Sequence, residues 1–121
     1  MANDFKRFQV NNATTSTGAS GDAGYTVPAG AGSSALESIV IGITLSNTSS
    51  TGITGDVCLD GLSGTDTYIV KGASIPAGSS LEVMAGNKLV LQNNGSAGDV
   101  LRITSGTASA LDATISVLED V

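Results

Sequence analysis

The chain has 121 residues, of which 40% are hydrophobic and only 3% aromatic, enough for one domain with an aliphatic core. It contains no His and one Cys, which excludes His-dependent catalytic triads, the usual zinc ligand sets and disulfide frameworks. A formal net charge of −6 makes nucleic-acid phosphates and anionic membranes poor partners. With 16 Gly and no sustained helical periodicity, the composition favours many short strands joined by polar turns.

Residues 1–24 are predicted to be an N-terminal arm. Two of the four aromatic residues and two of the five cations lie together there, as Phe5, Lys6, Arg7 and Phe8. Aromatic anchors beside basic groups are typical of protein interfaces, so we predict that these four residues bind a partner protein. Residues 11–24 are nearly all small or polar, which predicts a flexible tether to the domain. The alternative, that residues 5–10 form an edge strand of the same domain, stays open.

From residue 25 onward, strand patterns follow one another at short intervals. The clearest spans residues 38–46, where strict alternation predicts one buried face, made of Ile39, Ile41, Ile43 and Leu45. The pattern returns near the end of the chain at Leu111, Ala113, Ile115 and Val117. Leu101 and Ile103 complete the predicted core. Shorter strands are predicted at residues 25–27, 53–59, 67–71, 81–84, 88–92 and 100–104, each bounded by turn residues. The prediction is therefore an all-β protein: one antiparallel β-sandwich or jelly-roll-like domain over residues 25–121.

The acidic side chains and the single thiol give little sign of chemistry. Asp56, Asp60 and Asp66 surround a glycine-rich loop that could hold Ca²⁺, but their spacing fits no EF-hand and is typical of a hairpin. Cys58 is predicted on the outward face of a strand, between acidic neighbours and without a base to activate it. We therefore predict a non-enzymatic protein with no catalytic residue, metal or cofactor.

Several segments together resemble a known family. They are residues 25–30 (Tyr-Thr-Val-Pro-Ala-Gly), 39–48, 67–71, 75–83, 88–91, 98–103 and 111–119. This part of the chain, residues 25–121, resembles small virion structural proteins of tailed bacteriophages, notably marine and cyanobacterial ones. The resemblance implies a capsid decoration (cement) protein on the virion surface, made in the cytoplasm of the bacterial host. It also implies binding to the major capsid protein or another virion protein, and assembly as a homo-oligomer, most commonly a trimer.

Other functions stay open on the sequence. The chain could be a neck, tail or fibre-associated structural protein, or a small surface- or carbohydrate-binding module. A glycosidase built on Glu37 and Glu82 ranks last, because sugar clefts are normally lined with aromatic residues. The thin, aromatic-poor core predicts burial between subunits, through the exposed side of the Cys58 strand or a face formed by Val40, Gly42 and Thr44.

Overall fold

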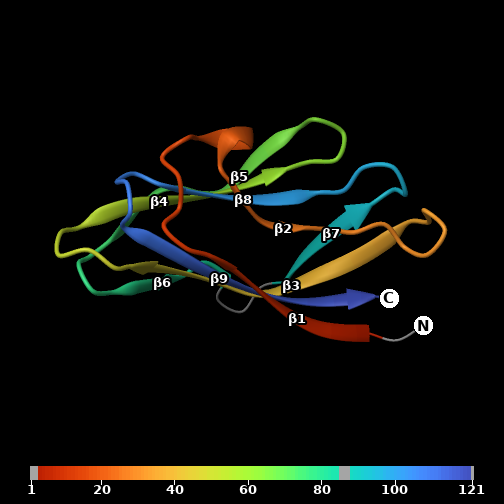
Figure 1. Cartoon of the computed structure of the whole chain (residues 1–121), viewed down its shortest axis with the longest axis horizontal. Coiled ribbons are helices and arrows are strands. Elements are labelled where there is room, and N and C mark those ends of the chain that lie inside the picture. The colour runs from red at the N-terminus through yellow and green to blue at the C-terminus, as the bar shows by residue number, and fades with distance from the viewer. Residues whose placement is uncertain (1–2, 85–87, 121) are drawn as a thin grey trace.

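The computed structural model describes residues 3–84 and 88–120 of the chain (Figure 1). Within these residues the elements are, in chain order, β1 (Asn3–Val10), the 3₁₀ turn η1 (Gly18–Ser20), β2 (Asp22–Thr26), β3 (Leu36–Asn47), β4 (Ile53–Asp60), β5 (Asp66–Ile75), β6 (Ser80–Glu82), β7 (Leu89–Asn93), β8 (Val100–Ser105) and β9 (Leu111–Asp120).

The strands form two antiparallel sheets that lie one on the other (Figure 1). The five-stranded sheet has the order β1-β9-β3-β6, and β7 pairs with another part of β3. Residues 36–40 of β3 pair with β7, and residues 44–46 pair with β6. The four-stranded sheet has the order β2-β8-β4-β5. The predicted all-β antiparallel sandwich is confirmed.

The hydrophobic core lies between the two sheets, where alternate residues of each strand point inward. Strand β9 shows this most clearly, because the four residues of its predicted alternating face are all buried: Leu111, Ala113, and the predicted core residues Ile115 and Val117. The predicted pair on β8, Leu101 and Ile103, is also buried. Alternation with a period of two is therefore a sufficient guide to the core for these two strands.

Strand β3 contains an irregularity that its sequence does not reveal. Its pairing with β9 shifts in register between Val40 and Gly42, so that Ile41 is an extra residue on β3. An extra residue in one strand is a β-bulge. Each side chain after the bulge points to the face opposite to the one that regular alternation from the start of the strand would give it. Before the bulge, Val40 points into the core, although its sequence phase predicts the outer face.

The bulge divides the predicted core face of β3 in two. Ile43 and Leu45, which follow it, are fully buried as predicted. The prediction that Ile39 and Ile41 are core residues is wrong, because Ile39 is half-buried and Ile41 is 42% exposed. Both side chains belong to the outer side of the five-stranded sheet.

The N-terminal residues are part of the sandwich and not a separate arm. Strand β1 pairs with β9 along its whole length, from Asn3 opposite Asp120 to Val10 opposite Ala113. The edge-strand alternative is therefore the one that the structure supports. Val10 is buried in the core, which ties this end of β1 to the domain.

The segment predicted as a tether is packed against both sheets. The Ala13 side chain is buried, and its amide donates to the Leu111 carbonyl at 2.8 Å. The Ser105 amide donates to the Thr14 carbonyl at 2.8 Å, which joins the segment to β8. Strand β2 then begins at Asp22, so the predicted boundary after residue 24 does not separate two units. Small polar residues look like a linker in a sequence, but their backbone groups can still hydrogen-bond to neighbouring strands.

Candidate interaction surface

Two of the four predicted partner-binding residues are engaged within the domain. Strand alternation places Lys6 and Phe8 on the side of β1 that faces the other sheet. The Phe8 and Tyr25 ring centroids lie 4.7 Å apart, a typical aromatic contact. The Lys6 ammonium lies 3.0 Å from Oε1 of Glu119. These contacts hold β1 against the sandwich.

Glu119 is a buried carboxylate whose charge is compensated from several sides. Its Oε2 accepts a 2.7 Å hydrogen bond from the Tyr25 hydroxyl. Because that proton is given to Glu119, the Ser38 hydroxyl, 2.7 Å from the Tyr25 oxygen, is the donor of the second bond. The hydrogen bond and charge of Glu119 raise the pKa of Lys6, and burial raises the pKa of Tyr25. Tyr25, Ser38 and Glu119 are closed off from solvent, so this cluster stabilises the fold and is not open to a substrate.

The outer side of the five-stranded sheet carries a line of apolar side chains that four neighbouring strands contribute. Phe5 of β1 lies opposite Leu118 of β9, and Leu118 lies opposite Ile39 of β3. Ile39 in turn lies opposite Val90 of β7, and Ile41 stands beside it at the bulge. We call these five residues the apolar row.

The apolar row is exposed to an extent unusual for large hydrophobic side chains. Phe5 is 78% exposed, Val90 57% and Ile41 42%, while Leu118 and Ile39 are half-buried. At about 4.8 Å between strands, the row extends over roughly 14 Å. Scattered exposed hydrophobic residues need no explanation, but a contiguous line across four strands is a candidate interaction surface.

Charged residues of both signs surround the apolar row. Arg7 is exposed on β1, two residues after Phe5, and Lys88 is exposed immediately before β7. Glu37 is exposed on β3, and the exposed Glu82 of β6 lies within hydrogen-bonding distance of Thr44. Beside the row these two cations offset these two anions, although the chain as a whole has a net charge of −6. Strand alternation also places Asp112 on this side of the sheet, opposite Ser46 near the other end of β3, so the balance of charge applies to the neighbourhood of the row.

The outer side of the four-stranded sheet is partly covered by the chain itself. The turn η1 packs against β4, and Cys58 of β4 is buried, although its strand phase predicts an exposed position. Burial raises the pKa of the Cys58 thiol, and the nearby carboxylates of Asp66 and Asp60 raise it further. A buried thiol with a raised pKa is a poor nucleophile.

The acidic residues of the β4–β5 region each have a separate environment. The Asp60 carboxylate lies 3.2 Å from the Arg102 guanidinium, and Asp56 accepts a 2.7 Å hydrogen bond from the Gly72 amide. Asp66 is exposed. In residues 3–84 and 88–120, no three His, Cys, Asp or Glu side chains gather as a metal site would require.

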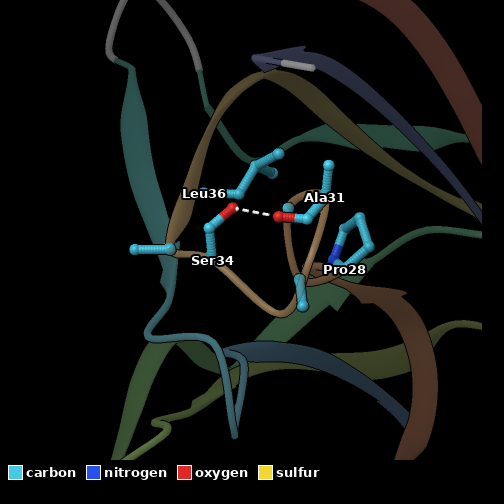
Figure 2. A pocket seen from close by; sticks show the side chains of 7 residues that line it. Pro28, Ala31, Ser34 and Leu36 are labelled. Carbon is cyan, nitrogen blue, oxygen red and sulfur yellow. Dashed lines mark hydrogen bonds between the residues drawn. The ribbon is translucent and has the colours of Figure 1, made fainter.

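A pocket of about 510 Å³ lies in the loop between β2 and β3 (Figure 2). It is lined by Pro28, Ala29, Gly30, Ala31, Ser34, Ala35 and Leu36. The loop is held closed where the Ser34 hydroxyl donates to the Ala31 carbonyl at 2.8 Å and the Gly30 amide donates to the Ser34 carbonyl at 2.8 Å. None of these lining residues is charged, so the pocket offers apolar contact, loop carbonyls and the Ser34 hydroxyl but no acidic or basic side chain.

The structure brings together residues that lie far apart in the sequence and were not predicted to share a surface. Phe5 remains exposed as predicted, but its apolar neighbours Leu118 and Val90 were not predicted as surface residues. One signal could have found them: Leu89, Val90 and Leu91 are consecutive apolar residues in a short strand, as are Val117 and Leu118 in β9. A strand that is apolar on both phases has an outer face that is apolar as well.

No family model matches the sequence, and no curated protein matches it either. Among the residues that the structure describes, no helix has the length and hydrophobicity needed to cross a membrane.

Proposed function

We propose that the chain is a non-enzymatic structural protein of a tailed-bacteriophage virion, a capsid decoration protein that binds and stabilises the head shell. Its partners would be the major capsid protein, or another virion protein, and further copies of itself, assembled as a homotrimer on the capsid surface. The proposal starts from the resemblance of residues 25–121 to small virion structural proteins.

The observation that carries the proposal furthest is the apolar row. A subunit of a particle must be soluble before assembly and must then bury surface against its neighbours. An acidic β-sandwich with one exposed apolar row, flanked by balanced charges, supports that behaviour. Of the four residues predicted to bind a partner, Phe5 and Arg7 are the two whose side chains remain available for that contact.

Particle fractionation tests this function. An antibody raised against the purified chain is used to probe a density gradient of particles released from the cells that produce it. The expected result is that the chain bands with DNA-filled heads, at a fixed ratio to the major capsid protein, and remains bound after a salt wash. A soluble host enzyme serves as the control and stays at the top of the gradient. Finding the chain only with that control would refute the proposed function.

A further inference from the structure

We propose that a second copy of this chain covers the apolar row, so that the outer sides of two five-stranded sheets pack face to face. This inference rests on the proposed function and deepens it, because it names which neighbour occupies this face. Association in solution and binding to particles are measured separately, so that either claim can fail alone.

The shape of the face favours another sheet as the occupant. The apolar row is formed by residues that lie opposite one another on four adjacent strands. It therefore runs across the strands on the surface of the sheet, from Phe5 at one end to Val90 at the other. Sheets pack on sheets at a spacing of about 10 Å by interdigitating aliphatic side chains, as the two sheets of this domain already do. A two-fold axis through the middle of the row places the row of one copy on that of the other, the commonest symmetry of protein dimers.

The size of the face is suitable for a stable contact between two copies. A sheet four strands wide and about eight residues long covers roughly 500 Å² in projection. A standard interface buries about 800 Å² of accessible surface on each partner. The accessible surface of this face is larger than its projected area, because the side chains protrude from the sheet, so the face approaches that standard size. The row then forms the apolar centre of the contact, and Arg7, Glu37 and Glu82 belong to its polar rim.

The distribution of charge allows a second copy of the same chain to approach this face. Two molecules that each carry −6 repel one another over most orientations. That repulsion is reduced beside the apolar row, where Arg7 and Lys88 offset Glu37 and Glu82. The row itself is uncharged, so it does not select an acidic or a basic partner. It follows that added salt should strengthen the association, because salt screens the net repulsion and leaves apolar contacts in place.

Sedimentation equilibrium of the full chain tests the inference, at concentrations of about 1 to 200 µM. The test variant is Val90→Lys, which places a charge in the row at a position that is 57% exposed. The matched control is Ser74→Lys, an exposed residue of β5 on the other sheet, with the same change in net charge. Phe5→Ser is a second variant, which shortens the row without adding charge. Far-UV circular dichroism checks that all four proteins are equally folded.

The expected result is reversible self-association of the wild type, tighter in 0.5 M than in 0.1 M salt. Val90→Lys and Phe5→Ser should each weaken it by about tenfold or more, whereas Ser74→Lys leaves it unchanged. A trimer that associates further, in a step that Val90→Lys weakens, also supports the inference, because the row is then a two-fold contact between copies of two trimers. A trimer without that further step overturns it, because a three-fold axis does not place one row on the same row of a second copy. A wild type that stays monomeric at every concentration overturns it, as does equal weakening by Val90→Lys and Ser74→Lys. A monomer that binds particles through the row would assign the face to a different virion protein.

Discussion

Truncation of two neighbouring isoleucines in β3 tests the bulge that creates the apolar row. Ile43 is fully buried, whereas Ile41, two residues earlier, is 42% exposed. Ile43→Ala removes three carbon groups from the core, at about 0.8 kcal/mol each for the lost burial. The cavity left behind adds to this, so we expect a loss of about 3–4 kcal/mol, within the usual range for buried isoleucine. For Ile41→Ala we expect at most about 1 kcal/mol, as for other partly exposed positions.

Urea unfolding followed by far-UV circular dichroism measures both free energies, since the chain has no Trp to serve as a fluorescent probe. The slope of the free energy with urea should be the same for the two variants, so that the difference lies in the midpoint. Equal losses, or a larger loss for Ile41→Ala, would mean that β3 alternates without a bulge. Ile41 would then be a core residue, and the reasoning that places it in the apolar row would be wrong.

Three further predictions concern buried residues. Stability should fall as the pH rises above about 10, the ordinary pKa of tyrosine. Both Tyr25 and Lys6 have raised pKa values in the folded chain, so the folded state holds protons that the unfolded chain releases. Urea titrations between pH 8 and pH 11 check this, and a constant midpoint would contradict it. The Cys58 thiol should react with a disulfide reagent far more slowly in the folded chain than in urea, whereas equal rates would mean that it is accessible. Gly24→Ala should cost about 1–3 kcal/mol by overpacking, because its new methyl group would lie 2.5 Å from Cδ1 of Ile115, whose side chain is fully buried and has little room to move; an unchanged urea midpoint would refute that contact.

The fold class and most of the core were predictable because period-two alternation is a local signal. Ile115 and Val117 of β9 are buried by the same rule that predicted them. Ile39 and Ile41 were misplaced because a bulge changes the phase of a strand without changing its composition. The partner strand determines where such an irregularity lies, and a single sequence does not contain that pairing.

The candidate surface was predictable only in part. Phe5 is notable in the sequence because aromatic residues are scarce, and it is indeed exposed. Its neighbours Lys6 and Phe8 belong to the same cluster of aromatic and basic residues, but their side chains face the other sheet. There Lys6 pairs with Glu119 and Phe8 contacts Tyr25, two residues from distant parts of the chain. Residues 5–8 point to two opposite faces of the sheet because side chains alternate along a strand. That rule could be applied only once these residues were known to form a strand.

The measurement that tests the proposed function most directly is an electron cryo-microscopy map of the intact particle. The account predicts copies of a two-sheet β domain on the outside of the capsid, with the apolar row buried in a contact between neighbouring copies. A map that accounts for every external density with other proteins would contradict the decoration role. A map that shows this domain on the capsid with its apolar row facing solvent would contradict the proposed contact between copies.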